Sequence, residues 1–394
     1  MKFADRAVAI APSATLAITA KAKELEKKGI DIVSFGAGEP DFDTPDFIKA
    51  SCKKSIDSGF TKYTPSEGII ELRDAIINKF KKDNGLVYDR SQICVCVGAK
   101  HALYVIFQVL LNPGDEVILQ SPYWVSYVEM VKMAGGEPVI IDTNESTGYK
   151  MTAEMIKDKL SKKTKAVILN SPSNPTGVVY TQEELKQLGN VLEVQDLYII
   201  SDEIYDKLLY DDEKHVSIAQ LSEKLFSKTI IVNGLSKTYS MTGWRVGYTA
   251  GPKEFINLMK NWISHSTSNV TSFCQTASVD AMNGDQNFLN DWIKTFQERR
   301  DVLVKGLNEI PGITCDNPKG AFYVFPSIKG IIGKEFGGNK INSSMELATY
   351  LLEKFNVAVV PGEAFGAPLN FRMSFATSIE KVKEGLARIK KAFT

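Results

Sequence analysis

The sequence has no excess of charge of either sign and no long apolar run. Its 394 residues contain 47 Lys and Arg against 47 Asp and Glu, so the formal net charge is zero. Without a basic excess to displace counterions, the composition argues against binding to nucleic acid or another polyanion. No apolar run approaches the roughly 18 residues that span a bilayer, and residues 1–6 form a mixed stretch instead of a secretory core. We therefore expect neither a nucleic-acid partner nor a membrane partner.

Cysteine, histidine and arginine are also scarce. Five cysteines, an odd number in a long chain, do not suit a disulfide framework, and none of the three histidines pairs with a second ligand at metal spacing. We therefore expect a cytoplasmic protein without a metal site. Only eight of the 47 basic residues are Arg. An Arg in an apolar strand of such a chain indicates a task that Lys cannot perform, such as bidentate binding of a carboxylate or phosphate.

Strand and helix patterns alternate regularly through the middle of the chain. Several predicted strands are continuous apolar runs, as in a parallel sheet covered on both faces. This alternation predicts an α/β fold with right-handed crossovers, whose ligands bind beyond the carboxyl ends of the strands. The predicted strands are 92–97, 116–120, 166–170, 197–201, 229–233 and 246–250, and the predicted helices are 46–57, 69–82, 101–111, 124–133 and 182–194.

A change in the pattern of predicted helices and strands near residue 283 predicts a second, smaller α+β domain. There a long helix (288–310) precedes short strands at 321–325, 357–360 and 371–376 and helices at 344–355 and 378–391, while the glycine-rich stretch 329–340 favours a mobile surface loop. Near the start, Ser13 is a suitable cap for a helix that Gly29 ends. We predict a large domain at 45–284, a small domain at 285–394, and an N-terminal segment (1–44) that associates with the small domain.

Lys237 is the most informative residue of the chain. It follows the predicted strand 229–233, Ser236 precedes it, and Arg245 lies eight residues further on. An amine that a carbonyl can reach, with a cation nearby for an anion, is what a Schiff-base lysine requires. The segment therefore predicts pyridoxal 5′-phosphate (PLP) as the cofactor.

Two other strand ends carry residues that fit the same cofactor. Asp202 can hold a protonated ring nitrogen, and Tyr205, three residues later, can hydrogen-bond an anionic ring oxygen. For Asp202, a carboxylate at a helix start is the alternative. Asn174 lies in the proline-containing turn 170–177, where it can donate to the ring oxygen or to a substrate carboxylate. A purely structural turn is the alternative there.

Three further positions fit an anion or a flat ring, and each has a structural alternative. Gly98 and Ala99 join a strand to a helix, where backbone N–H groups can approach a phosphate; an ordinary short connection is the alternative. Trp124 can stack on a ring or pack in the core. Arg372, within the apolar strand 371–376, suits the α-carboxylate of an amino acid, with a structural salt bridge as the rival interpretation.

Taken in order, these motifs resemble the aspartate aminotransferase family of fold-type-I PLP enzymes along essentially the whole chain. The resemblance is strongest to a bacterial subgroup with Pro-Ser-Ala-Thr (12–15), Gly-Glu-Pro-Asp-Phe-Asp-Thr-Pro (38–45) and Ser-Pro-Tyr-Trp-Val-Ser-Tyr (121–127). It implies an α/β large domain with a mostly parallel central sheet covered by helices, a smaller α+β domain, and a homodimer with shared active sites.

The resemblance also implies a role for each candidate residue. It makes Lys237 the Schiff-base lysine and proton shuttle, and Asp202 the partner of the pyridinium nitrogen. The other implied cofactor contacts are Tyr205 and Asn174 at the ring oxygen, Trp124 on the ring, Gly98, Ala99, Ser236 and Arg245 at the phosphate, and Tyr63 reaching the phosphate from the partner subunit. The implied substrate contacts are Arg372, Asn174 and Gly38 at the α-carboxylate, Trp124, and Lys100 and Thr15 at the distal carboxylate.

The sequence departs from the family pattern at several positions. Gly234 stands where many relatives have a phosphate-binding Ser, and Tyr127 stands where some have a His behind the aspartate. The Arg that binds the distal carboxylate in the best-known branch has no evident counterpart, which is why Lys100 and Thr15 are expected to do that work.

The implied reaction is ping-pong transamination between aspartate or glutamate and 2-oxo acids. Because Lys100 and Thr15 can by resemblance also serve prephenate, a glutamate/aspartate–prephenate aminotransferase stays open as an alternative. A PLP-dependent lyase or aminocyclopropane-forming enzyme is a further alternative. An aminotransferase-like DNA-binding regulator is disfavoured, because only about forty residues precede the core.

Overall fold

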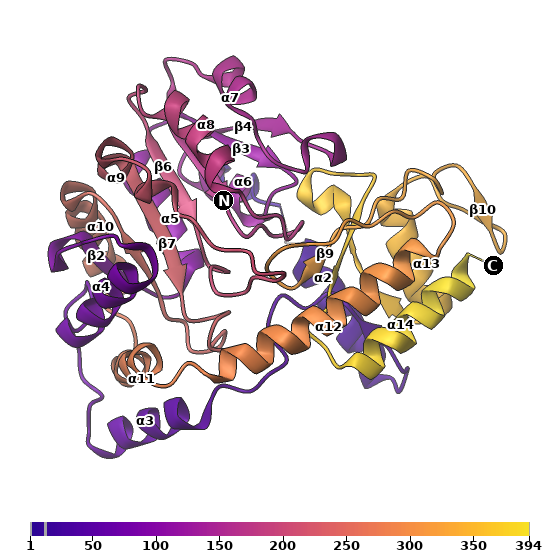
Figure 1. Cartoon of the computed structure of the whole chain (residues 1–394), viewed down its shortest axis with the longest axis horizontal. Coiled ribbons are helices and arrows are strands. Elements are labelled where there is room, and N and C mark those ends of the chain that lie inside the picture. Colours follow the sequence, from indigo (N-terminus) through magenta and orange to yellow (C-terminus); the bar gives the residue numbers. More distant parts are fainter. Residues whose placement is uncertain (1, 12–13, 394) are drawn as a thin grey trace.

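The chain folds into two lobes that a long helix connects. The computed structural model describes residues 2–11 and 14–393, without the side chains of several residues in the first two helices. Figure 1 shows helix α12 (Phe288–Asn308) running from the larger lobe into the smaller one, which carries the C-terminus at its far end. The predicted cap Ser13 lies outside the described residues, but the helix that it would begin, α2 (Ala14–Lys27), ends just before Gly29 as predicted.

A seven-stranded sheet forms the centre of the larger lobe. Its strand order is β2-β8-β7-β6-β5-β3-β4, and all neighbours pair in parallel except β8, which is antiparallel to β2 and β7. The mostly parallel sheet predicted from the sequence is thus confirmed. Its strands are β2 (Ile93–Cys96), β3 (Glu116–Ser121), β4 (Glu137–Asp142), β5 (Thr164–Asn170), β6 (Tyr198–Asp202), β7 (Thr229–Gly234) and β8 (Gly247–Ala250).

The sequence did not reveal β4, for a physical reason. It is an edge strand that contains Pro138, and most of its residues are only partly buried. An edge strand tolerates proline and lacks the continuous apolar run of a central strand.

Helices cover both faces of the sheet. One core cluster includes Phe107, Leu119 and Val232, and two others lie on the opposite side of the sheet or around its β2 end, with Val167 and Tyr248 among their members. The helices of this lobe are α3 (Asp46–Asp57), α4 (Ile70–Asn84), α5 (Ala99–Leu110), α6 (Ser126–Met133), α7 (Ala153–Lys159), α8 (Gln182–Leu192), α9 (Glu223–Lys228), α10 (Lys253–Ser266) and α11 (Ser272–Asn283).

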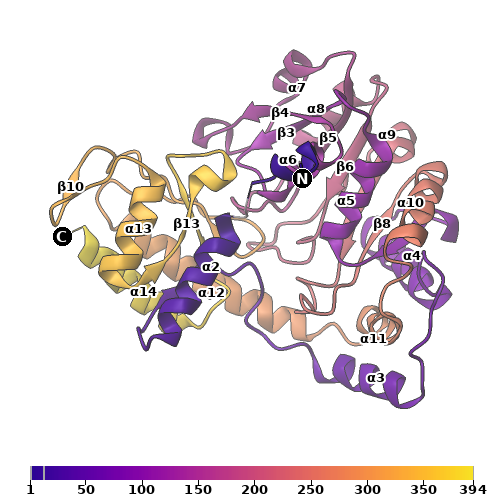
Figure 2. The same cartoon turned by 180° about the vertical axis from the view of Figure 1, so that it is seen from behind.

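The smaller lobe is an α+β unit, as predicted. It contains the antiparallel sheet β13-β14-β9, with the core cluster around Phe322 and Phe371 beside it. Residues 14–34 of the N-terminal segment lie against this lobe, because β1 pairs in parallel with β12 and Figures 1 and 2 both show α2 beside the C-terminal helices, whereas α1 (Asp5–Val8) lies against α6 of the larger lobe. The exact domain boundaries stay a prediction. The elements are β1 (Val33–Ser34), β9 (Tyr323–Val324), β12 (Val357–Ala358), β13 (Val360–Pro361), β14 (Phe371–Ser374), α13 (Ser344–Phe355) and α14 (Ile379–Ala392).

The glycine-rich stretch 329–340 is not a plain loop. It contains the antiparallel hairpin β10 (Glu335–Phe336) and β11 (Asn339–Lys340), so this part of the prediction was wrong. Gly337 and Gly338, both at positive φ, form the turn between these two short strands, which is the backbone geometry that a tight hairpin turn requires.

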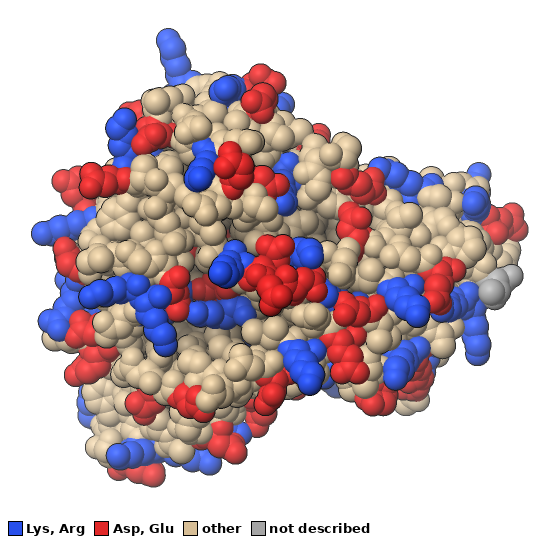
Figure 3. All heavy atoms as spheres, viewed as in Figure 1, with Lys and Arg blue, Asp and Glu red and all other residues tan. Residues whose placement is uncertain are grey.

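The surface carries both kinds of charge. Figure 3 shows Lys and Arg interspersed with Asp and Glu over the visible face. Within residues 2–11 and 14–393 no helix has the length and apolarity to cross a membrane, and no group of three or more His, Cys, Asp or Glu is placed to hold a metal.

Candidate active site

A cavity of about 650 Å³ lies at the carboxyl ends of β5, β6 and β7, where the two lobes meet. Its wall brings together most of the residues predicted for the site, although they come from segments far apart in the sequence. Those that line it are Gly38, Ala99, Lys100, Trp124, Asn174, Asp202, Tyr205, Ser236, Lys237, Arg245 and Arg372.

The remaining three predicted residues have different positions. Gly98 precedes Ala99 directly and packs against the guanidinium group of Arg245. Tyr63 does not line the cavity and is 89% exposed. Thr15 belongs to α2, but its side chain lies outside what the structure describes.

Lys237 lies in the turn after β7, and its amine points into the cavity. Its Nζ donates to the backbone oxygen of Gly38 and lies 5.9 Å from the centre of the Tyr205 ring. Burial lowers the pKa of Lys237 to about 8, helped by the positive charges of Arg372 and Arg245 and opposed by Glu39. A lysine with this pKa is partly neutral near pH 7.5, as a nucleophile or a proton-transfer base must be.

Asp202 is held at the end of β6 by two hydrogen bonds. Its Oδ2 accepts from the Tyr127 hydroxyl at 2.6 Å, and its Oδ1 accepts from the backbone N–H of Ile204 at 3.3 Å. Burial raises the pKa of Asp202 to about 6, although the bond from Tyr127 opposes the rise. Above that pH the site holds a buried, oriented carboxylate, which suits a protonated ring nitrogen. Asp202 therefore does not act as a helix-start carboxylate.

Arg372 is a buried cation without a carboxylate partner among the described residues. It is 3% exposed and lies on β14, where Nη1 donates to Asn174 Oδ1 and Nη2 donates to the backbone oxygen of Gly36, both at 3.0 Å. Its Nε is buried and has no hydrogen-bond partner in this part of the chain. Since a buried charge is costly unless it is paired, an anionic ligand at this guanidinium would offset that cost. The structural salt bridge that was the rival interpretation is not found among the residues that the structure describes.

The corner of the cavity at the amino end of α5 has features that suit an anion. The first N–H groups of a helix lack intrahelical partners and attract negative charge, and Arg245 and Ser236 border the same space. Gly98 has φ of +82°, and a Cβ there would lie 2.5 Å from Arg245 Nη2. Only glycine therefore allows the guanidinium to approach this turn so closely.

Gly234 lies just behind this corner and does not line the cavity. A Cβ at this position would lie 3.0 Å from Gly247 Cα and from the Val246 oxygen. The glycine allows β7 and β8 to pack closely, so a serine of the kind found in many relatives would not fit here without a shift of the backbone.

Trp124 and Lys100 lie side by side on the cavity wall. The Lys100 Nζ is 4.9 Å from the centre of the Trp124 ring, and the Trp124 ring stands nearly perpendicular to Tyr127, with 5.3 Å between their centres. Burial, together with the charge of Arg245, lowers the pKa of Lys100. An anion near the Lys100 ammonium would stabilise its charged form and so oppose this lowering of the pKa.

Among the cavity residues that were not predicted for the site are Glu39, Thr242 and Tyr323. Thr242 donates to Glu39 at 2.7 Å, and the Tyr323 hydroxyl lies 2.9 Å from that of Tyr205 while its ring lies 4.4 Å from the Arg372 guanidinium. Tyr323 lies in a predicted apolar strand, where nothing in the local pattern shows that its hydroxyl faces a site.

Comparisons with known proteins agree with this geometry. Residues 30–389 match the family model of aminotransferase class I and II. The chain is 50% identical over 391 residues to an aspartate aminotransferase of Bacillus subtilis, covering 99% of this chain and 98% of the relative. It is 49% identical over 389 residues to an aspartate/prephenate aminotransferase of Cereibacter sphaeroides, covering 98% and 97%.

Among solved structures, the aspartate aminotransferase from Rhizobium meliloti superposes with a TM-score of 0.97 at 43% identity, covering 100% of this chain and 98% of that one. The Thermus thermophilus aspartate aminotransferase with maleate superposes with a TM-score of 0.94 at 40% identity, and both chains are covered completely. The chain belongs to the aminotransferase class I and II family.

Proposed function

We propose that this protein is a PLP-dependent aminotransferase that moves an amino group between aspartate or glutamate and 2-oxo acids by a ping-pong mechanism. The single observation that carries the proposal is the buried Arg372, which lacks a carboxylate partner among the described residues and faces the same cavity as Lys237. The chain's full-length similarity to proteins named aspartate aminotransferase supports the same substrate class.

The residues of the cavity fit PLP at each of its polar groups. Asp202 would pair with the ring nitrogen, and Tyr205 and Asn174 would hold the ring oxygen. The phosphate would lie between Arg245, Ser236 and the backbone of Gly98 and Ala99, in the turn that a Cβ on Gly98 would obstruct. Trp124 would cover the ring. When bound, PLP supplies an aldehyde that captures the amino group and a ring that accepts electron density.

The chain itself supplies positioning and proton transfer. Lys237 Nζ would take the proton from the substrate α-carbon and return a proton to the cofactor carbon. Its pKa of about 8 supports this role. Asp202 would keep the ring nitrogen protonated, since a carboxylate in a buried site favours the charged form of its partner. Arg372, with Asn174 and Gly38, would fix the α-carboxylate and so orient the α-carbon toward Lys237.

Lys100 is the candidate for the distal carboxylate of the substrate, and the resemblance to the family adds Thr15 as a second candidate. The position of Lys100 on the cavity wall supports this role. The same group can also receive the second carboxylate of prephenate, and relatives named aspartate/prephenate aminotransferase make prephenate the second candidate acceptor.

We propose that the enzyme is a homodimer with shared active sites and acts in the cytoplasm. Tyr63 exposes 89% of its surface and does not reach its own cavity, which supports a position from which it contacts the phosphate in the partner subunit. Phe60 and Trp262 are also substantially exposed apolar residues. Burial of these side chains in a dimer would remove them from water.

An assay with aspartate and a panel of 2-oxo acids tests the function. We expect PLP-dependent release of oxaloacetate with 2-oxoglutarate and initial rates that give parallel double-reciprocal lines. A rate with prephenate would establish the second activity, and no rate above background would exclude it. Product release that does not depend on any oxo acid would contradict transamination and favour a lyase.

Subunit mixing tests the shared site. A Tyr63→Ala variant and a Lys237→Ala variant, each impaired alone, should recover activity when the two are co-refolded, because half of the sites in the hybrid dimer contain both native residues. The Lys237→Ala homodimer mixed with itself is the control. No recovery in a hybrid that has been shown to form would refute the contribution of Tyr63 from the partner.

A further inference from the structure

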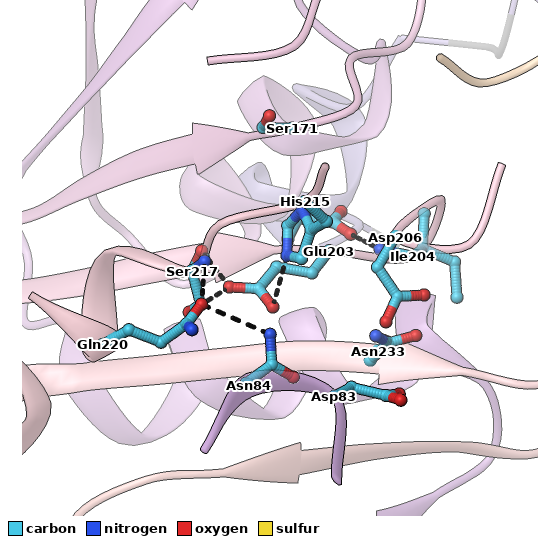
Figure 4. Close-up of polar contacts among 12 residues, drawn as sticks. Asp83, Asn84, Ser171, Glu203, Ile204, Asp206, His215, Ser217, Gln220 and Asn233 are labelled. Atoms are coloured by element: carbon cyan, nitrogen blue, oxygen red, sulfur yellow. Dashed lines mark hydrogen bonds and ion pairs between the residues drawn. The ribbon is translucent and has the colours of Figure 1, made fainter. Parts of the chain in front are cut away.

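The turn that carries Asp202 and Tyr205 also carries two acidic residues at the same spacing, Glu203 and Asp206. Asp202 and Tyr205 line the cavity, whereas Glu203 and Asp206 do not. Both are nonetheless buried, at 1% and 5% exposure. Figure 4 shows their side chains among polar groups from other segments, including His215, Ser217 and Asn233. No role in binding or catalysis assigned above explains this buried charge.

Glu203 ties the turn to the chain segment that returns behind it. Its Oε1 accepts hydrogen bonds from the hydroxyls of Ser201 at 2.8 Å and Ser217 at 2.6 Å. Its Oε2 accepts from His215 Nε2 at 3.0 Å. Three donors thus hold one carboxylate, and two of them come from residues more than ten positions further along the chain.

Asp206 ties the same turn to helix α4. Its Oδ2 accepts from Lys79 Nζ, which also lies 3.6 Å from Asp83. Burial opposes the charge of Lys79, but Asp206 and Asp83 raise the pKa of Lys79. Burial likewise opposes the charge of Asp206, but Lys79 lowers the pKa of Asp206. The two groups therefore form an ion pair across the ordinary pH range.

The surroundings of the turn are partly polar, although Ile204 and Tyr205 themselves pack in an apolar core cluster. Lys79, Asp83, Asp206 and Asn233 border a second cavity of about 310 Å³ on this side. The buried Nδ2 of Asn233 has no partner among the described residues. Because polar groups border this cavity together with the apolar Leu235 and Tyr248, the bonds of Glu203 and Asp206 contribute to the position of the turn.

Backbone bonds make the turn a single unit. The N–H of Asp206 donates to the Glu203 oxygen at 3.0 Å, and the N–H of Ile204 donates to Asp202 Oδ1. A shift of Glu203 or Asp206 is therefore transmitted directly to Asp202 and Tyr205. Because a buried ion pair contributes less stability than apolar groups of the same size, stability alone does not account for charged groups at these two places.

We propose that Glu203 and Asp206 are positioning residues of the reaction, which anchor the turn from behind and so hold Asp202 and Tyr205 at the correct distance from the cofactor ring. The inference rests on the proposed function, since it assigns the front of the turn to PLP. The length of each anchoring side chain, more than its charge, is what sets the position of the turn.

Matched substitutions at Glu203 separate length from charge. Glu203→Gln keeps the length and can keep all three hydrogen bonds, because either ring nitrogen of His215 can carry the hydrogen. Glu203→Asp keeps the charge but is one methylene shorter. We expect Glu203→Gln to stay within threefold of the native enzyme. We expect Glu203→Asp to lower kcat and raise the Kd for PLP about tenfold each, with the KM for aspartate within twofold because Arg372 is untouched.

The same design applies to Asp206, where Asn keeps the length and Glu changes it. The Kd for PLP is measured by tryptophan fluorescence of the apoprotein, which does not depend on turnover. The control is Glu184→Gln on α8. This change removes the ion pair that Glu184 forms with Lys150 at 2.8 Å. It should change the melting temperature without changing kcat or the Kd for PLP.

Three results would overturn the inference. Glu203→Asp and Asp206→Glu with native kcat and native PLP affinity would show that the rear side chains do not position the site. If Glu203→Gln lowered kcat and PLP affinity as much as Glu203→Asp, the charge of Glu203 would matter instead of its length. Glu203 would then act through its contribution to the raised pKa of Asp202. Losses in activity that follow the folded fraction alone would indicate a structural role. A native enzyme without transaminase activity would refute the proposed function instead, whatever the variants show.

Discussion

Replacement of Asp202 by Asn should stabilise the apoprotein and at the same time abolish tight cofactor binding. In the folded chain burial raises the pKa of Asp202 to about 6 from its ordinary value of 3.8. Between these two values the folded state binds more protons than the unfolded state, so the stability falls as the pH rises through that window. Above pH 6 the buried carboxylate is charged, and the free energy of unfolding is lowered by the full amount of this effect.

The magnitude follows from the size of the shift. About two pKa units at 1.36 kcal/mol each give a cost of about 3 kcal/mol at pH 8, and roughly half of that at pH 5. Asn removes the charge while keeping the shape, and its amide can still bond with the Tyr127 hydroxyl and the Ile204 N–H. The variant apoprotein should therefore be more stable than the native one by about 3 kcal/mol at pH 8 and by about half as much at pH 5.

Urea unfolding of both apoproteins, at equal subunit concentration and at several pH values, measures this difference. With PLP added the order should reverse. Loss of one partner of a buried ion pair costs about 3–5 kcal/mol, so the Kd for PLP should rise at least a hundredfold. A stability difference that does not change with pH, or a variant that binds PLP as tightly as the native chain, would refute the assignment of Asp202.

Three further substitutions test other parts of the site. Arg372→Lys should raise the KM for aspartate about ten- to a hundredfold, because a point charge cannot replace the guanidinium fork; an unchanged KM in steady-state assays would count against it. Lys100→Met should lower kcat/KM for aspartate about tenfold or more while leaving alanine, which has no distal carboxylate, unaffected; equal losses for both substrates would show that Lys100 does not read the distal group. Gly98→Ala should weaken PLP binding about tenfold, since it places a Cβ 2.5 Å from Arg245 at a φ of +82°. Gly243→Ala, where a Cβ meets nothing within 4 Å, is the control. Equal effects of the two changes would contradict the proposed phosphate site at Gly98.

The sequence predicted many of the elements whose pattern is local, although helices α7, α9 and α10 were not predicted. Continuous apolar runs located six of the seven strands of the central sheet, and the residues that follow them, Lys237 and Asp202, do lie in the cavity. Helix α11 was not predicted, because its buried side includes Ser272, Gln275 and Ser278 and so gives no apolar stripe.

Contacts between distant segments could not be predicted. Tyr127 and Asp202 are 75 residues apart, and Tyr205 and Tyr323 are 118 apart. Their hydrogen bonds depend on how β3, β6 and the smaller lobe meet in space, which periodicity along one segment does not encode. Arg372 shows the same limit. The scarcity of arginine in the composition indicated a special task for an Arg in an apolar strand. Only the fold reveals that no carboxylate of the described chain neutralises Arg372.

The absorbance spectrum of the purified protein with PLP, recorded before and after addition of aspartate, tests the central claim most directly. We predict a yellow band from cofactor bound at Lys237, bleaching of that band by aspartate alone, and its return when 2-oxoglutarate is added. The band should be absent from Lys237→Ala. A band that aspartate leaves unchanged, or one that persists unaltered in Lys237→Ala, would contradict the account.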